Sequence, residues 1–333
     1  MRSFVDKSAA QRRHQKKDFS IYQFIPNSSN ELMAGFQISI IAGKDAQSCS
    51  VTASGQVQHI ITDEEMETFK VTNGELMMAL YKGNGRMPTL PYLHAPTPPF
   101  GNLYEMFNST QTSTIMSITS AEILGITSEP VILKTQEFDN SSSVEATFNV
   151  SISDSVSETA TSTWSTGGTF TIGQSISYNI GFLGSSVGGE TSLSYSQSWG
   201  IGGSESKTVT IGSNSGMQVT LKPGQKVIAE LTASRGVMKV RVRYNARLAG
   251  CTVVYYFPKH KGNDYYSFST PVVMSNGGVN NSIVSTEDIE IGYFSNGKIT
   301  VLDGVTKKLQ ETFQVDDSVL FSNREDGGDP FKE

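Results

Sequence analysis

The stretch that decides the fold runs from Phe170 to Trp199 and reads FTIGQSISYNIGFLGSSVGGETSLSYSQSW. Up to Phe182 the even positions are mostly large and apolar, and the odd positions hold Ser, Thr, Asn and Gly. After a glycine-bearing break the apolar phase moves to odd positions, beginning at Val187. A period of two residues is typical of a β-strand with one apolar face. The stretch is therefore predicted to be a long β-hairpin.

The two predicted strands, 170–182 and 187–199, are much longer than the usual 5–6 residues. Tilted strands of about 9–11 residues cross a bilayer, with apolar side chains outward and polar ones inward. The predicted membrane-inserting residues are Phe170, Ile172, Ile176, Tyr178, Ile180, Phe182, Leu183, Val187, Leu193, Tyr195 and Trp199. The predicted pore-lining residues are Ser175, Ser177, Asn179, Glu190, Ser192, Ser194 and Ser196.

A single hairpin cannot enter a bilayer, because the amides at its edges would lack hydrogen-bond partners. Several copies must therefore close a barrel, and a homo-oligomer is expected. We expect Gln174 to lie opposite Gln197, which places Tyr178 opposite Leu193 and puts the turn at 183–188. Glu158 lies outside this span and is expected to remain in water.

The sequence on either side of the hairpin also predicts a mainly β protein. Alternation begins at Val144, and further strands are expected at 209–221, 227–233 and 239–248, with a Lys222–Gln225 turn. An Asn-Gly pair predicts a last hairpin over 293–301. The N-terminal part is mixed: Thr62 and Glu65 form a capping-box pattern, a second short helix is expected at 75–81, and a proline-rich loop covers 87–100.

The Ser/Thr-rich strands of Thr159–Gly203, the segment Val219–Val227 and the basic strand up to Gly250 resemble the aerolysin, epsilon-toxin and mosquitocidal-toxin group of β-pore-forming proteins. The resemblance covers about residues 125–310. It implies an elongated fold with long twisted antiparallel strands, and a ring of about seven or eight copies on the membrane. The expected division is a small mixed α/β head over 1–125, as a candidate receptor-binding region, and a pore-forming module over 126–333. Within that module the insertion hairpin is expected at about 160–204 and a loose tail at about 323–333.

The function that follows is that of a pore-forming toxin or defence protein, which binds a target membrane, oligomerises and inserts its hairpin as a transmembrane β-barrel. The alternative is a non-lytic lectin, adhesin or storage protein on the same scaffold. The receptor can be a glycan, a lipid or a protein. Aromatic residues in and after the proline-rich loop can bind it or can belong to the core: Tyr92, Phe100, Tyr104 and Phe107. The cations of the strand 239–247 can contact acidic headgroups or a neighbouring protomer, or simply face solvent: Lys239, Arg241, Arg243 and Arg247.

Other function classes receive little support. The net charge is −6, with no dominant basic surface, so no nucleic-acid partner is expected. The four histidines lack metal-ligand spacing, and no nucleophile motif occurs, so the prediction names no catalytic, metal or cofactor residue and no cofactor. The first residues show no signal-peptide pattern. We therefore expect a soluble protein that acts at a target membrane after release and is otherwise cytoplasmic.

Overall fold

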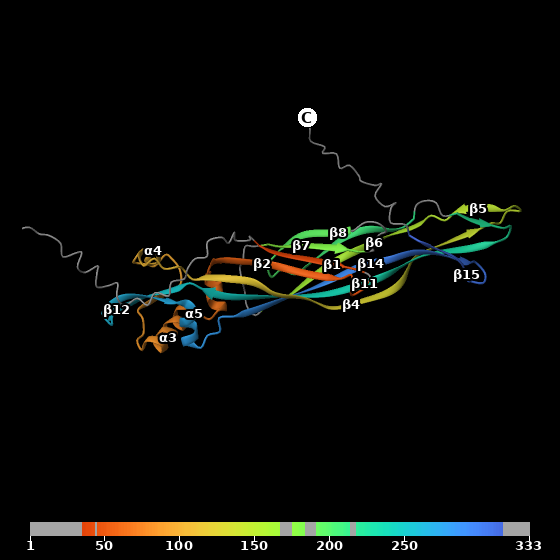
Figure 1. Cartoon of the computed structure of the whole chain (residues 1–333). Helices are drawn as coiled ribbons and strands as arrows, with labels where there is room; N and C mark the ends of the chain where they lie inside the picture. Colours follow the sequence, from red (N-terminus) through yellow and green to blue (C-terminus); the bar gives the residue numbers. More distant parts are fainter. Residues whose placement is uncertain (1–34, 44, 167–174, 184–190, 214–217, 316–333) are drawn as a thin grey trace, which may run out of the picture. The chain divides into compact units, whose positions relative to one another are not determined.

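A computed structural model describes residues 35–43, 45–166, 175–183, 191–213 and 218–315 (Figure 1). The strands of the first half are β1 (Phe36–Ala42), β2 (Ser50–Ile60), β3 (Leu90–Tyr92), β4 (Ser113–Asp139), β5 (Ala146–Asn149), β6 (Ile152–Thr166) and β7 (Ser175–Phe182). The strands of the second half are β8 (Thr191–Ser198), β9 (Gly203–Ser213), β10 (Gln218–Leu221), β11 (Lys226–Ala249), β12 (Cys251–His260), β13 (Asn263–Ser269), β14 (Ile283–Asp303) and β15 (Leu309–Gln314). The helices are α2 (Asp63–Thr68), α3 (Asn73–Asn84), α4 (Leu103–Met106) and α5 (Thr270–Gly277). The prediction of a mainly β protein is confirmed.

One large sheet holds the longest strands. Its order is β8-β7-β1-β2-β4-β11-β14-β6-β9, and β15 adds to β14. At its centre β11, with 24 residues, pairs antiparallel with both β4 and β14. Its inward row is almost entirely apolar and its outward row carries Lys239, Arg241 and Arg243. Pairing with β4 and β14 along nearly its whole length explains why the chain forms one long strand here, where two strands at 227–233 and 239–248 were predicted.

The predicted hairpin over 293–301 is wrong, because β14 runs without a turn from Ile283 to Asp303. Asn296 has a positive φ of 55°, and the register of β14 against β11 shifts between Thr232 and Ser234. Asn-Gly therefore forms a bulge within a continuous strand. Pairing with β11 on both sides of the bulge outweighs the local preference for a turn.

A second, three-stranded sheet of order β13-β12-β3 lies with the short helices. Helix α2 begins with the predicted capping box, since Thr62 and Glu65 bond each other's backbone amides. The predicted turn at Lys222 is also present, with the Gln225 amide donating to the Lys222 carbonyl. Residue 125, where the head was expected to end, lies inside the continuous strand β4. The functional division into head and pore module stays a prediction.

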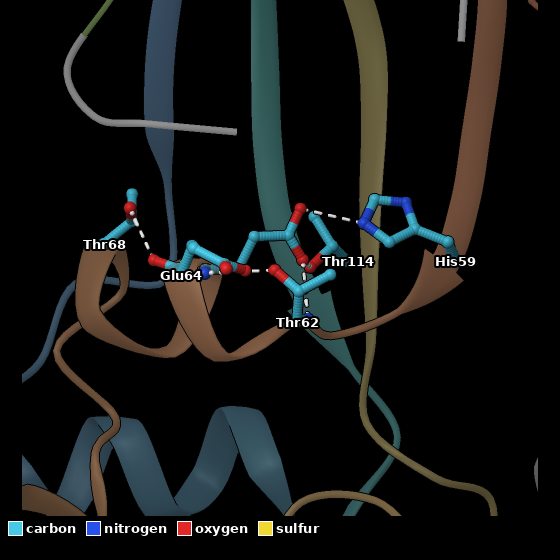
Figure 2. Close-up of polar contacts among 6 residues, drawn as sticks. His59, Thr62, Glu64, Thr68 and Thr114 are labelled. Carbon is cyan, nitrogen blue, oxygen red and sulfur yellow. Dashed lines mark hydrogen bonds and ion pairs between the residues drawn. The ribbon is translucent and has the colours of Figure 1, made fainter. Parts of the chain in front are cut away.

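The capping glutamate of α2 has a further structural task. The carboxylate of the fully buried Glu65 contacts His59, Thr62 and Thr114, the three residues of this group that Figure 2 labels. The Nε2 atom of His59 lies 2.8 Å from one oxygen, and the Thr114 hydroxyl donates to the other at 2.6 Å. These contacts join β2, α2 and β4. We therefore regard this carboxylate as a structural brace.

Candidate functional site

The predicted insertion hairpin is present as β7 and β8, which we call the central hairpin. The two strands pair antiparallel from Ser175–Ser198 to Phe182–Thr191. On its other edge β7 pairs with β1, in parallel, from Phe36–Ile176 to Ala42–Phe182. Figure 1 shows β7 and β8 in green beside the orange β1. β8 is the terminal strand of the sheet path, so among the described strands one backbone ladder attaches the central hairpin to the rest of the sheet.

The two faces of the central hairpin differ as the sequence predicts. The inward residues of β7, and Trp199 just after β8, are buried, and the inward residues of β8 are half-buried. These inward apolar residues are Ile176, Tyr178, Ile180, Phe182, Leu193, Tyr195 and Trp199. The exposed residues include Ser175, Ser177, Asn179, Ser192, Ser194 and Ser196. Leu183 is half-buried, whereas Phe170, Ile172, Val187 and Glu190 lie outside the described residues.

The predicted register is wrong for this conformation. Tyr178 lies opposite Tyr195, and Ile176 lies opposite Gln197, a shift of two residues from the prediction. The rings of Tyr178 and Tyr195 stack with centroids 4.7 Å apart, which is a favourable cross-strand aromatic pair. Gln174, which was expected to pair with Gln197, lies outside the described residues.

A buried carboxylate on β14 contacts the inner face of the central hairpin. Glu287 is fully buried and accepts three hydrogen bonds. The hydroxyls of Ser162 on β6 and Tyr178 on β7 donate to Oε1, each at 2.5 Å, and the hydroxyl of Tyr244 on β11 donates to Oε2 at 2.7 Å. Burial raises the pKa of Glu287, and the three hydroxyls only partly offset it. Burial also raises the pKa of the Tyr244 hydroxyl, together with the nearby Glu287 charge.

Glu158 on β6 makes a related contact, which the sequence did not predict. It is fully buried, and its Oε2 accepts a hydrogen bond of 2.9 Å from the Thr191 hydroxyl at the start of β8. The expectation that Glu158 stays in water is therefore wrong in this conformation, because the central hairpin covers it. Nearby, Lys207 on β9 donates to the Ser192 carbonyl at 3.0 Å.

An aromatic cluster fixes the base of the central hairpin. The ring of Trp199 lies 4.6 Å from Trp164 on β6 and 4.4 Å from Tyr244 on β11, measured between centroids. Phe36 on β1 contacts both Trp199 and Tyr244. The apolar face of the central hairpin is thus stored against the sheet rather than exposed to water.

The four aromatic residues proposed for receptor binding lie close together near the three-stranded sheet but have different surroundings. Tyr104 is only 2% exposed, and its hydroxyl donates to the carbonyls of Tyr92 and Cys251. Burial raises the pKa of this hydroxyl well above its ordinary value. Tyr92, Phe100 and Phe107 are half-buried. Phe100 packs on Tyr255 and Tyr265, with centroids 4.6 and 5.3 Å apart.

Sequence reasoning missed Phe257, which is 74% exposed on β12. It shares its strand with the cluster residue Tyr255. No periodicity distinguishes it, because β12 is irregular between Tyr255 and His260. An exposed phenylalanine on the strand that also carries Tyr255 is a candidate contact residue.

Three cations of the basic strand pair with carboxylates of their own sheet, and Arg247 is exposed. Arg241 forms a two-pronged ion pair with Asp288 at 2.7 and 2.8 Å, which lowers the pKa of Asp288. Arg243 lies 2.7 Å from Glu122, and Lys239 lies 3.3 Å from Glu290. These three cations are therefore paired with carboxylates of β4 and β14. This arrangement agrees with the alternative that the basic row of β11 is a solvent-facing surface.

The described part of the chain lacks two other features. No group of three or more His, Cys, Asp or Glu side chains in it is placed to hold a metal ion. None of its helices is long and apolar enough to cross a membrane.

Comparison with known proteins places the chain among named toxins. U-megalopygitoxin(8)-Mc8 of Megalopyge crispata is 30% identical over 281 residues, which cover 84% of this chain and 96% of that protein. U-megalopygitoxin(8)-Mo15 of Megalopyge opercularis is 33% identical over 258 residues, 78% of this chain and 81% of that protein. The chain belongs to the U-megalopygitoxin(8) family. No protein-family model matches this megalopygitoxin sequence.

The megalopygitoxin fold has a counterpart among solved structures. Parasporin-2, a Bacillus thuringiensis toxin that recognizes cancer cells, matches 78% of this chain and 100% of its own, with a TM-score of 0.57 and 16% identity. At this identity the likeness concerns the fold alone. The resemblance to the aerolysin-like β-pore-forming group, which the sequence indicates, is confirmed at that level.

Proposed function

We propose that this megalopygitoxin binds a target membrane, assembles into a ring of identical copies and inserts its central hairpin as part of a transmembrane β-barrel. It would act at that membrane after release from the cell that makes it. The single observation that carries the proposal is the two-sided central hairpin, held at the end of the sheet with its apolar face stored inward. Its exposed face consists of small polar side chains, as a water-filled lumen requires.

The attachment of the central hairpin supports its release. β7 is held by the parallel ladder with β1, and parallel pairing is slightly less stable per residue than antiparallel pairing. β8 ends the sheet path, so detachment breaks no ladder on its outer side. The internal β7–β8 ladder can stay intact, and the hairpin can move as a unit.

The described strands contain eight residues each, slightly fewer than the 9–11 that a transmembrane strand needs. The inserted form therefore has to add neighbouring residues to each strand. The sequence predicts such residues within 170–174 and 187–190, which lie outside the described residues. Phe170, Ile172 and Val187 would extend the lipid face and Glu190 the lumen face.

For the receptor contact we propose the exposed side of the aromatic cluster. Phe257 would join Tyr92, Phe100 and Phe107 in contacting a glycan, lipid or protein of the target surface. Tyr104 would support this surface from beneath, since its hydroxyl connects the carbonyls of Tyr92 and Cys251.

A disulfide that joins the central hairpin to β1 tests the proposal. Ser39 and Asn179 are exposed partners in the β1–β7 ladder. Neighbouring strands lie about 4.8 Å apart, within the range that a disulfide bridges. In a chain whose Cys49 and Cys251 are replaced by Ser, S39C/N179C should be inactive when oxidised and active after reduction. The measurement is dye release from vesicles prepared from plasma membranes of cultured cells, together with electron microscopy of rings.

The matched control places the disulfide inside the central hairpin. S177C/S196C joins two exposed partners of β7 and β8 and leaves the β1–β7 ladder untouched. This variant should release dye whether oxidised or reduced. If the oxidised S39C/N179C variant releases as much dye as its reduced form, hairpin insertion is rejected. Intact vesicles and no rings with every form would favour the non-lytic lectin, adhesin or storage protein.

A further inference from the structure

Glu287 occupies an unusual position for a carboxylate. It lies on the inward row of β14, in phase with the buried Ile289 and Ile291, and none of its surface is exposed. Burying an ionised carboxylate is costly unless hydrogen bonds or opposite charges compensate. Hydroxyl groups surround this one, and no ion pair with it is present in the described part of the chain.

The three hydroxyl donors come from different parts of the fold. Ser162 belongs to β6 and Tyr244 to β11, and both strands pair directly with β14, the strand of Glu287. Tyr178 belongs to the central hairpin. Its bond to Glu287 is therefore a polar contact that crosses from the stored hairpin to the body of the sheet.

We propose that Glu287 is a positioning residue that holds the central hairpin in its stored place, and that a rise in pH favours release of the hairpin by ionising this side chain. This inference rests on the proposed function and adds a mode of regulation to it. The geometry carries it: a fully buried carboxylate, a hairpin hydroxyl bonded to it, and a hairpin that covers it.

Burial and the neighbouring carboxylate of Asp288 shift the pKa of Glu287 in the same direction. Its pKa is raised first by burial and further by the adjacent Asp288, while the three hydroxyls lower it. Asp288 faces outward and is paired with Arg241. The other acidic groups on the elements packed around Glu287 are Tyr178 on β7, Tyr195 on β8, Tyr244 on β11, Glu158 on β6 and Glu205 on β9. Cations on these elements have other partners: Lys207 on β9 donates to the Ser192 carbonyl, and Lys239, Arg241 and Arg243 on the outward row of β11 pair with Glu290, Asp288 and Glu122.

The sign of the effect follows from comparing the stored and released states. When the hairpin leaves, water reaches the carboxyl group and its pKa returns toward the ordinary value. The stored state then keeps the proton to higher pH than the released state does. Storage is therefore fully favoured below the ordinary pKa, and this contribution is lost as pH rises through the raised pKa. Within that interval the ratio of released to stored hairpin should rise by up to about tenfold per pH unit.

A neutral carboxyl also suits the site chemically. A protonated Glu287 can donate one hydrogen bond to a neighbouring hydroxyl and still accept from the other two, because hydroxyl groups both donate and accept. An ionised Glu287 accepts from all three but remains a charge that is buried away from water and has no ion-pair partner among the described residues. Departure of the central hairpin then lets water solvate that charge.

The experiment measures opening of the central hairpin without a membrane. The full chain carries Ser at positions 49 and 251 and one new cysteine, either I180C on the buried face of β7 or S177C on its exposed face. Both are labelled with dithiodipyridine between about pH 4 and pH 9, an interval that begins below the ordinary pKa of a glutamate side chain and extends well above it. The ratio of the two labelling rates reports the open fraction and cancels the intrinsic pH dependence of the thiol.

In the otherwise native chain this ratio should rise with pH and then level off. In E287Q, which keeps the shape but cannot ionise, it should stay constant within about twofold. E290Q is the matched control, because Glu290 lies on the same strand but is exposed and faces Lys239. It should reproduce the native profile.

Several outcomes would overturn the proposal. A flat native profile would do so, as would an E287Q profile that rises like the native one. If E287Q does not fold, Y178F decides, since it removes only the hairpin hydroxyl. Y178F should open more than the native chain at every pH, and unchanged opening would reject the role of Glu287. Dye release is measured separately. If the labelling ratio depends on pH as expected but the vesicles release no dye, the proposed function is rejected and this inference is retained.

Discussion

Tyr178 and Tyr195 stack across the central hairpin, with ring planes 11° apart, yet only the Tyr178 hydroxyl has a hydrogen-bond partner. The Tyr195 hydroxyl is buried and has none among the described residues. Two similar side chains, placed opposite each other, therefore contribute differently to holding the hairpin.

We expect Y178F to weaken the attachment of the central hairpin by about 1–3 kcal/mol, because a buried carboxyl group loses a hydrogen-bond donor. The measurement is hydrogen exchange of the β7 amides, which reports local opening. Y195F is the control and should change the opening free energy little, since the Tyr195 hydroxyl has no hydrogen bond to the described residues that could be lost. Equal effects of both substitutions would contradict the assignment.

We expect G236A to destabilise the sheet. A Cβ atom at Gly236 on β11 would lie 2.3 Å from the ring of Tyr293, which covers this glycine from β14. Overpacking of this kind costs about 1–3 kcal/mol. The measurement is the free energy of unfolding in urea. G125A on the paired strand β4 is the control, because nothing lies within 4 Å of its added Cβ, and it should be close to neutral.

We expect the bulge in β14 to respond to substitution at its positive-φ residue. Asn296 tolerates the left-handed conformation better than most residues, so N296A should cost about 1 kcal/mol of unfolding free energy. N296G should be neutral or slightly stabilising, because glycine adopts this conformation freely. Thermal unfolding of the three proteins checks this. A stable N296A protein would mean that the bulge relaxes without a positive φ.

We expect F257A to reduce attachment to target membranes with little effect on stability, since the side chain is mostly exposed and packs weakly. The measurement is co-sedimentation with plasma-membrane vesicles, alongside the midpoint of thermal unfolding. V305A is the control: Val305 is 81% exposed in the segment between β14 and β15. Loss of attachment with V305A but not with F257A would place the contact surface elsewhere.

The sequence predicted those features that repeat along the chain. The alternation after Phe170 located the central hairpin and the sides of Tyr178 and Ser177, because a period of two residues fixes the face of every residue in a strand. It did not fix the register, which in a hairpin depends on the turn. The pairing of Tyr178 with Tyr195 therefore differs from the expected one by two residues.

Features that depend on distant strands were missed for a different reason. The Asn296-Gly297 pair is a strong local turn signal, but β11 continues on both sides and holds the chain straight. Glu287 was missed although a signal existed, because it lies in phase with Ile289 and Ile291. Its partners Ser162 and Tyr244 are 125 and 43 residues away, so their convergence could not be predicted from spacing.

The serine-lined side of the central hairpin has one more consequence. In the stored molecule Ser177 and Ser194 already touch solvent, and in the proposed channel they would touch solvent again. These serine side chains would therefore stay hydrated throughout insertion of the central hairpin. Only the apolar face changes its contacts, from protein side chains to lipid acyl chains. Insertion would therefore require dehydration of little beyond the backbone and a few hydroxyl groups.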